Sequence, residues 1–559
     1  MLSDAMSQAM ALRSTRVSLR RLGPLGWASL VAAALMMLPL IAVVASVFQG
    51  GGETWGHLFA TMLPRYVGNT LVLLAGVSLG VVSMGVLSAW LVTTYRFPAR
   101  RLLDWALILP LAMPAYVMAY AYTDWLQFTG PVQSALRALT GWQARQYWFP
   151  EIRSIWGAVA ILSFALYPYV YLIARTAFLG LSRSAIEAGR LAGYSVWGSF
   201  FRVAVPLARP AIVAGTALAL METLADFGTV SYFALEVFTT GIFKAWFSMG
   251  DPVAAGQLAT CLLGFVALVL GLERASRGHA AYYAGAPRHP APAPMLRGSR
   301  AALAVVACAA PVAFGFLLPA GILAHLALGD PQASWGPRVL GLVGNSFTIA
   351  GVTAFGAVVL AATMAYAARL SRSALVSGVN RVAGLGYAVP GAVIAIGVLV
   401  PLGRFDNLLA GWLEQALGLN VGLLLTGTIV ALVYAYLVRF LAVALQTMEA
   451  GLSKITPSME DAARSLGTTP GGTLARVHAP LLASSLATAA LLVFVDVMKE
   501  LPATFALRPF NFDTLAVEAY HLAKDERLAE AAIPSLLIVA VGVLPLILAS
   551  RGIMRAGER

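Results

Sequence analysis

Four acidic residues stand inside long apolar stretches, where charged side chains are rare. Glu222 and Asp226 lie four positions apart, and Asp496 and Glu500 repeat that spacing further along the chain. Residues four apart share one face of a helix. A charge at the centre of a membrane span costs roughly 2.5–3.5 kcal/mol on insertion scales, so such acids usually face an aqueous path. The four carboxylates are therefore candidates for lining a translocation path.

Carboxylate oxygens suit a hard cation, but a structural role for the acids stays open. Lys499 can pair with Asp496 three positions earlier, and the other acids can pair with loop residues or lie at the membrane interface. Tyr116, Tyr120 and Tyr122 offer phenolate oxygens, although an aromatic stripe is more often packing. The histidines are scattered and the two cysteines form no CxxC pair, so no metal site is firmly predicted.

The elements that carry these residues are apolar runs of membrane-spanning length. The chain has 559 residues, of which 59% are hydrophobic and 11% charged, whereas a soluble protein carries about 25% charged residues. A span needs about 20 apolar residues, and runs of this length that are apolar all round indicate helices rather than barrel strands. We expect an all-α integral membrane protein with about 12 transmembrane helices, near residues 25–48, 67–94, 103–128, 155–178, 210–232, 253–273, 301–328, 344–368, 382–402, 423–446, 485–505 and 531–550.

The positive charges favour one orientation in the bilayer. With the N-terminus inside, cytoplasmic segments and the adjoining helix ends hold 27 of the 38 lysines and arginines, and the external loops hold 10. Cytoplasmic loops carry such an excess in membrane proteins. Both termini are therefore expected in the cytoplasm, and the net charge of +13 does not indicate a nucleic-acid partner.

The two halves of the chain repeat each other. With six spans in each half, the halves keep the same orientation, so their symmetry axis is expected along the membrane normal. Residues 1–276 and 301–559 are the expected transmembrane halves, and the Ala/Pro-rich segment 277–300 reads as a cytoplasmic linker. At offsets of 276 or 274, the matched residues are Asn69 with Asn345, Met113-Pro114 with Val389-Pro390, Gly193 with Gly467, Pro206 with Pro480, Glu222 with Asp496 and Asp251 with Asp525.

The longest cytoplasmic loop of each half carries one pattern, over residues 187–206 and 461–480. An acid is followed by small residues, a glycine comes six positions after the acid, and a proline comes thirteen after the glycine. The pattern predicts a short helix, a glycine turn at positive φ, and a second short helix stopped near the next span. Small residues after the acid leave room for another surface. Two amphipathic loops lying on the membrane are the alternative.

This pattern resembles the coupling loop of ABC-importer permeases, with its E-A-A-x-x-x-G motif. Gly189 replaces the second alanine in the first copy, and Asp461 replaces the glutamate in the second, which shortens the reach of that side chain. The matching positions are Glu187, Ala188, Gly189, Gly193 and Pro206, then Asp461, Ala462, Ala463, Gly467 and Pro480.

The resemblance implies a division of labour between subunits. Each loop would dock into a groove of a separate ATPase subunit, expected as a homodimer that holds the ATP and Mg²⁺. This chain has no P-loop, because none of its four lysines follows a glycine. We therefore expect a transport subunit with no catalytic residues and no cofactor of its own. It would work in a bacterial inner membrane with an extracytoplasmic binding protein that docks on outer loops such as 129–154 and 506–530.

The substrate is a finer question. Residues 222–259 and 496–510, with the fused two-half layout, resemble ferric-iron permeases of bacterial ABC importers, while a fused thiamine permease shares the same plan. From another class, an ion-coupled secondary transporter also has twelve spans, but it has no use for paired docking loops. A membrane enzyme would need a catalytic constellation, but the sequence contains no HExxH motif and no convergent cysteine–histidine set.

Overall fold

The computed structural model describes residues 23–50, 52–143, 146–180, 193–277, 294–329, 336–371 and 373–557. Throughout these residues the regular structure is helical, apart from one isolated bridge between Arg96 and Met295. Helices are the expected solution for apolar segments in lipid, because every backbone N–H and C=O is bonded within its own segment.

Eleven of the described helical segments are long and apolar enough to cross a membrane, or up to twelve if one bent pair is a single span. The expectation of an all-α membrane protein with about twelve spans is confirmed. The segments are Gly23–Gln49, Glu53–Thr94, Ile155–Gly180, Trp197–Ala225, Pro252–Ser276, Gly298–Gly329, Pro337–Ser371, Gly391–Leu417, Ile429–Ser453, Arg476–Met498 and Leu528–Ile547.

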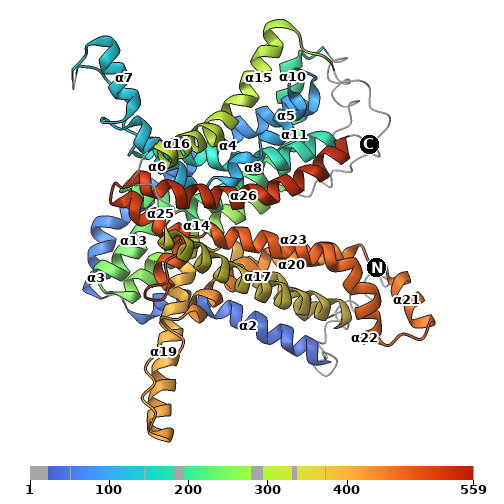
Figure 1. Ribbon diagram of the computed structural model, residues 1–559. Coiled ribbons are helices and arrows are strands. Elements are labelled where there is room, and N and C mark those ends of the chain that lie inside the picture. Colours follow the sequence, from blue (N-terminus) through green and yellow to red (C-terminus); the bar gives the residue numbers. More distant parts are fainter. Residues whose placement is uncertain are drawn as a thin grey trace, which may run out of the picture. The chain divides into compact units, whose positions relative to one another are not determined.

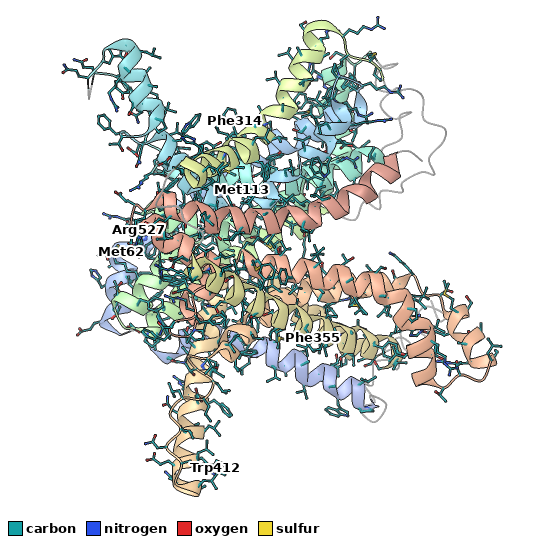
Figure 2. The ribbon with its side chains drawn as sticks, viewed as in Figure 1. Met62, Met113, Phe314, Phe355, Trp412 and Arg527 are labelled. Carbon is teal, nitrogen blue, oxygen red and sulfur yellow. The ribbon has the colours of Figure 1, made fainter. Side chains whose placement is uncertain are left out.

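The predicted span 103–128 is not one straight helix. Helical residues Arg100–Ala112 and Ala115–Thr140 meet at a bend of 93°, and the break falls on Met113 and Pro114, which both have extended ψ angles, 106° and 139°. Proline has no N–H for an i−4 bond, and it disfavours the helical region for the residue before it. Met113 and Pro114 therefore form the corner; Figure 2 labels Met113 among the side chains.

The second half breaks at the matching position. Val389 and Pro390 have ψ angles of 126° and 141°, so the predicted span 382–402 contains a corner rather than a straight helix. The repeat seen in the sequence is therefore also a repeat of backbone geometry. The breaks are preceded by α5 (Arg100–Ala106) with η4 (Leu109–Ala112) and by α18 (Ala374–Ala383) with η8 (Gly384–Ala388); they are followed by α6 (Ala115–Leu126) and α19 (Gly391–Leu417).

The helices form two compact units that do not coincide with the two halves of the sequence. The first unit comprises residues 1–49 and 343–513, and the second comprises 50–342 and 514–559. Each unit thus takes in helices from the other half. The halves 1–276 and 301–559 remain a division along the sequence, and most of the expected linker 277–300 lies outside the described residues.

In the first unit, α2 packs against α18 and α19 although more than 320 residues separate them along the chain (Figure 1). Ser29 donates to Asn380 Oδ1 at 2.8 Å, and Tyr434 donates to the carbonyl of Leu35. Bonds between such distant segments fix which helix lies beside which, and the Ser29–Asn380 bond is buried. The helices of this unit are α2 (Gly23–Ala45), α17 (Pro337–Ser371), α18, α19, α20 (Ile429–Ser453), α21 (Pro457–Ser465), α22 (Pro470–Thr473), α23 (Ala479–Met498) and α24 (Pro502–Leu507).

In the second unit, α4 and α8 form the most extensive helix pair. Gly76 and Gly80 of α4 face α8 so closely that a Cβ on either would lie under 3.0 Å from Val159 or Ser163, as is usual where small residues let helices approach in membranes. The main helices here are α4 (Leu63–Thr94), α5, α6, α7 (Pro131–Thr140), α8 (Ile155–Gly180), α11 (Val205–Ala225), α12 (Gly228–Tyr232), α13 (Phe238–Phe243), α14 (Pro252–Arg277), α15 (Gly298–Val312), α16 (Leu318–Gly329), α25 (Leu515–Lys524) and α26 (Leu528–Gly557).

Candidate functional site

Two of the four acidic residues singled out in the sequence lie at a second pair of helix breaks, and the other two lie in the last turns before them. The predicted spans 210–232 and 485–505 are not continuous, because α11 ends at Ala225 and α23 at Met498, and each is followed by a short helix, α12 or α24. Asp226 stands in the first break with a ψ of 130°, and Glu500 stands in the second. The backbone amides freed at such breaks need acceptors.

Asp226 and Glu500 supply those acceptors in the same way. Asp226 accepts from the Val230 N–H at 3.1 Å and from the Thr229 hydroxyl at 3.0 Å. Glu500 accepts from the N–H groups of Ala503 and Thr504, both at 3.0 Å. A carboxylate at the start of a helix both satisfies its free N–H groups and complements the helix dipole. One role of these acids is therefore to hold a short helix at each break.

A matched asparagine fixes the loop beyond each short helix. Asn69 donates to the carbonyl of Glu236 at 2.8 Å, and Asn345 donates to the carbonyl of Asp513 at 3.0 Å. Both asparagines were singled out in the sequence as members of the repeat. The two equivalent bonds show that the two halves build the region after the break in the same way.

The two kinds of break meet in the first unit. Gly391 opens α19 directly after the Pro390 corner, and a Cβ on it would lie 2.5 Å from both the Arg439 guanidinium and the Glu500 carboxylate. In the second unit α6, which follows the Pro114 corner, packs on α12, with the Tyr120 and Tyr232 rings 4.8 Å apart. Each unit therefore packs one broken helix against another.

The acids differ between the units in their counter-charges. In the first unit, buried Arg439 pairs with Glu500 at 3.2 Å, and Lys499 pairs with Asp496 at 2.9 Å. The ion pair between Lys499 and Asp496 that the spacing allows is thus present. In the second unit, Glu222 and Asp226 are both partly exposed, and no cationic group of the described residues lies within 4.0 Å of either. Of the four acids, those without a nearby cation among the described residues are therefore the two in the first half of the chain, Glu222 and Asp226.

The tyrosines of the third predicted span are packing residues in this structure. Tyr116 and Tyr120 are almost fully buried with rings 5.8 Å apart, and Tyr122 donates to the carbonyl of Phe314 at 2.5 Å. Among the described residues, no group of three or more histidines, cysteines or acids is placed to hold a metal ion. Direct ligation of a metal by such a cluster therefore has no support in the described part of the chain.

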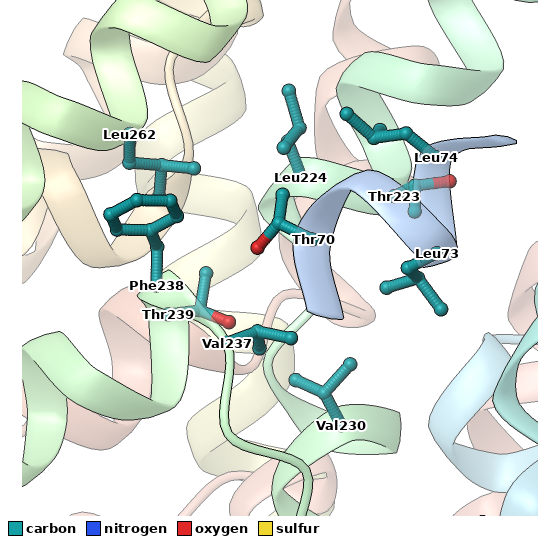
Figure 3. Close-up of a pocket in the computed structure, with 10 residues that line it drawn as sticks. All are labelled: Thr70, Leu73, Leu74, Thr223, Leu224, Val230, Val237, Phe238, Thr239 and Leu262. Atoms are coloured by element: carbon teal, nitrogen blue, oxygen red, sulfur yellow. The ribbon is translucent and has the colours of Figure 1, made fainter. Parts of the chain in front are cut away.

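A small pocket lies beside the break that follows α11 (Figure 3). The sequence analysis did not predict this pocket. Its walls are mostly apolar, and the Thr70 hydroxyl is buried there with no hydrogen-bond partner among the residues that the structure describes. Thr239, also in the wall, donates to the backbone carbonyl of Asp226 at 2.9 Å. The lining residues are Thr70, Leu73, Leu74, Thr223, Leu224, Val230, Val237, Phe238, Thr239 and Leu262.

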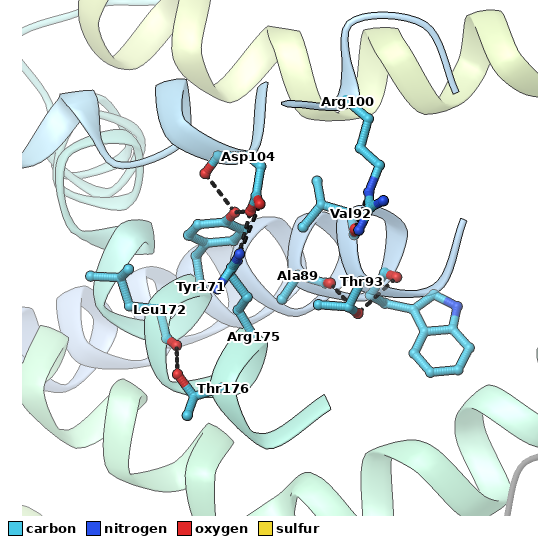
Figure 4. Close-up of polar contacts among 10 residues, drawn as sticks. Ala89, Val92, Thr93, Arg100, Asp104, Tyr171, Leu172, Arg175 and Thr176 are labelled. Atoms are coloured by element: carbon cyan, nitrogen blue, oxygen red, sulfur yellow. Dashed lines mark hydrogen bonds and ion pairs between the residues drawn. The ribbon is translucent and has the colours of Figure 1, made fainter. Parts of the chain in front are cut away.

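A carboxylate also anchors the helix that precedes the Pro114 corner (Figure 4). Asp104 of α5 receives two bonds from Arg175 of α8, at 2.6 and 2.8 Å, and a third from the Tyr171 hydroxyl at 2.6 Å. Bidentate arginine–carboxylate pairs are strong and directional. The short segment before the corner is thereby fixed to a long neighbouring helix.

The loop of the second half between α20 and α23 has the predicted helix, turn and second helix. Helix α21 ends at Ser465, Gly467 has a φ of +79°, and α22 begins at Pro470. Thr468 N–H bonds to the carbonyl of Ala463 at 3.1 Å, and Gly467 N–H bonds to that of Arg464 at 2.9 Å. This is a Schellman motif, in which the residue at positive φ is usually glycine.

In the first half only the end of the matching loop is described. Glu187, Ala188 and Gly189 lie outside the described residues, whereas Gly193 has a φ of +86°. The glycine turns therefore match. The second short helix is not stopped in either half, because it runs through a π-helical turn into α11 or α23, and Pro206 and Pro480 lie in the first turns of these helices. Proline lacks the N–H for an i−4 bond, and in both halves a π-helical turn directly precedes it in the continuous helix.

The loop of the second half offers a mixed surface. Asp461 and Ala462 are exposed, and Leu466 and Met459 expose 85% and 43% of their surface. Ala463 is buried within the loop, so only the first of the two alanines is open to another surface. Exposed apolar side chains on a polar loop are typical of a protein contact site.

Behind this surface, a partly buried ion pair connects the loop to the spans. Arg369, in the last turn of α17, bonds to Glu460 of α21 at 2.7 Å and to the carbonyls of Leu452 and Ile455 at 2.6 and 2.7 Å. The His478 ring lies 3.3 Å from the same Glu460 oxygen. Sequence reasoning missed Arg369 and Glu460, although Glu460 directly precedes the motif acid. Together they join the loop to α17 and α20.

The segment that contains the first loop and the first acidic break is similar to a known protein family. Residues 81–272, which include the first loop and the first acidic break, match the family described as binding-protein-dependent transport system inner membrane component. These residues belong to that permease family. The chain is accordingly a multi-pass inner-membrane transport subunit rather than an enzyme.

Relatives of this permease cover either its whole length or about half of it. The Fe(3+)-transport system permease protein FbpB 2 of Haemophilus influenzae is 26% identical over 519 residues, which cover 92% of this chain and 95% of that protein. The sulfate transport system permease protein CysT of Escherichia coli is 29% identical over 274 residues, 45% of this chain and 93% of that protein. The molybdenum transport system permease protein ModB of Escherichia coli is 29% identical over 154 residues, 27% of this chain and 64% of that protein. A half-length match with CysT agrees with a permease made of two fused halves.

Proposed function

We propose that this permease is the membrane subunit of an ATP-driven importer and that it moves ferric iron into the cytoplasm. The observation that carries the proposal is the pair of glycine turns, Gly193 and Gly467, at matching positions of the two cytoplasmic loops, in a chain similar over 92% of its length to an Fe(3+)-transport permease. An extracytoplasmic binding protein would deliver the cargo, and both termini would lie in the cytoplasm.

The cytoplasmic loops would receive the motion of an ATPase dimer. The exposed face of α21, with Asp461, Ala462 and Leu466, would enter a groove of the ATPase subunit. Movement of α21 would pass through the Glu460–Arg369 pair to the ends of α17 and α20. The same loop continues without a stop into α23, so it is also coupled to the break at Glu500.

The acids at the breaks would act on the cargo unequally. Glu500 and Asp496 are already neutralised by Arg439 and Lys499, so Glu222 and Asp226 are the carboxylates left to attract a cation. A site without a ligand cluster suits transit, because a transported ion must leave as readily as it enters. The tight binding would then belong to the extracytoplasmic binding protein.

Uptake into vesicles tests this proposal. Right-side-out membrane vesicles that contain the permease, its ATPase and its binding protein should accumulate radiolabelled ferric iron when ATP is inside. A protonophore should not stop this uptake. Uptake that requires the proton gradient and not ATP would instead show a secondary transporter. ATP-dependent uptake of sulfate, molybdate or thiamine in place of iron would retain the importer and replace the cargo.

A further inference from the structure

The second part of α19 does not behave like a membrane span. Helix α19 has 27 residues, about 40 Å at 1.5 Å per residue, while the hydrocarbon core is about 30 Å thick. Its first turns, Gly391 to Val398, are buried, whereas beyond Gly403 most side chains are exposed. In Figure 1, α19 runs across the direction shared by α2, α17, α20 and α23 of the same unit.

This exposed part is strongly amphipathic. With about 100° between successive residues of a helix, Phe405, Leu408 and Trp412 fall on one arc, and they are 54%, 75% and 60% exposed. The exposed polar residues Asn407 and Glu414 fall on the opposite arc. A helix with one bare apolar face and one polar face is suited to the boundary between two media.

A buried carboxylate holds the returning chain against this helix. Asp406 is fully buried and accepts the N–H groups of Leu424, Leu425 and Thr426 at 2.8, 2.9 and 2.7 Å. The hairpin is therefore built as a unit, and its apolar side chains are not free to fold onto one another. The returning loop adds further exposed apolar residues, namely Leu419, Val421, Leu423 and Leu424.

We propose that residues 404–428, the lateral hairpin, lie in the headgroup region of the bilayer with Phe405, Leu408 and Trp412 in contact with acyl chains. Both ends of the hairpin continue into helices that are long and apolar enough to span a membrane, α19 and α20, so the hairpin cannot lie far from the bilayer. Exposed Arg404 and Asn407 lie near the middle of α19, where a span through lipid would bury them at high cost. Tryptophan is enriched at membrane interfaces.

In the orientation proposed above, the lateral hairpin rests on the outer leaflet. It would then fix the Pro390 corner, and with it Gly391 against the Arg439–Glu500 pair, relative to the membrane plane. The hairpin would act as an anchor that stays still while the cytoplasmic ends of the helices move.

Spin labels test the lateral hairpin in lipid nanodiscs. In a Cys261→Ser/Cys308→Ser background, labels at F405C and W412C should be more accessible to oxygen than to a water-soluble nickel chelate by several fold. Matched labels at N407C and E414C, on the opposite arc, should show the reverse. Equal access to the nickel chelate at all four positions, or oxygen access at all four, would overturn the proposal.

A second measurement uses the unaltered chain, so it does not depend on the cysteine variants folding. A photoreactive phosphatidylcholine in the same nanodiscs should leave adducts on Phe405, Leu408 or Trp412 and spare Asn407 and Glu414. Adducts on neither face would contradict a lipid contact. Loss of water access at Phe405 and Trp412 only when a binding protein is added would show that a protein covers this face instead.

Discussion

At the scale of single residues, the two halves place acids alike and neutralise them differently. Asp226 and Glu500 each cap a short helix at a break, but only Glu500 has a buried arginine beside it. A buried carboxylate without its cation is costly, whereas a partly exposed one is solvated. The same position in the repeat can therefore be structural in one half and available to a cargo in the other.

The first prediction separates the two ion pairs of the first unit. Arg439→Met leaves Glu500 buried and unpaired, which should lower the stability of the folded permease by roughly 3–5 kcal/mol. Lys499→Met breaks a more exposed pair and should cost about 1 kcal/mol or less. Thermal unfolding of both variants in nanodiscs measures the difference. Equal losses would mean that Arg439 does not compensate Glu500.

The second prediction concerns the uncompensated acids. Glu222→Gln and Asp226→Asn remove negative charge, and the asparagine keeps an acceptor for the Val230 N–H, so the fold should hold while uptake slows several-fold. Asp496→Asn is the matched control, because Lys499 already neutralises that carboxylate. Uptake rates and ATPase binding are measured together. If uptake by the two variants is unchanged, Glu222 and Asp226 are structural.

At the scale of elements, the repeat and the run lengths predict the helices well, but not their corners. Pro114 and Pro390 break their helices, while Pro39, Pro168 and Pro210 lie inside continuous ones. The local sequence does not distinguish these cases, because neighbouring helices decide whether a freed carbonyl finds another donor. The capping roles of Asp226 and Glu500 were hidden for the same reason, since the spans were expected to be unbroken.

The glycine turns give a prediction at this scale. Leucine at Gly193 and Gly467 should abolish transport and leave membrane insertion intact. A Cβ at either position meets nothing within 4 Å, so the internal cost is the backbone conformation alone, roughly 1–2 kcal/mol, while the side chain would obstruct the docking surface. Gly250→Leu is the matched control, because Gly250 also has a positive φ, +65°, and a Cβ on it meets nothing within 4 Å. Transport retained in the double variant would refute the coupling role.

The Arg369–Glu460 ion pair behind the loop gives a second prediction at this scale. Glu460→Gln and Arg369→Lys weaken the connection between α21 and the ends of α17 and α20. ATP hydrolysis by the assembled complex should continue, and the amount of cargo moved per ATP should fall several-fold. Measuring both rates on the same proteoliposomes gives this ratio. Parallel loss of hydrolysis and uptake would mean that the pair serves only to assemble the complex.

At the scale of the whole molecule, the repeat in the sequence does not show which helices pack together. Each compact unit takes in helices from both halves, so α2 rests on α18 and α19, and α26 belongs with the first-half helices. Such long-range pairing depends on shape and on single buried bonds, such as Ser29 to Asn380, which local patterns do not encode.

A consequence is that neither half carries all the helices of a unit, so separated halves should be insoluble alone and should recover transport when co-expressed.

In the proposed mechanism, this permease moves its cargo only when an external ATPase drives its cytoplasmic loops. The most direct measurement is cargo flux in proteoliposomes that contain the purified permease, first alone and then with its ATPase, binding protein and ATP. We predict no flux above that of empty liposomes for the permease alone, and sustained uptake for the complete system. Full-rate flux through the permease alone, in either direction, would show that transport does not require the ATPase.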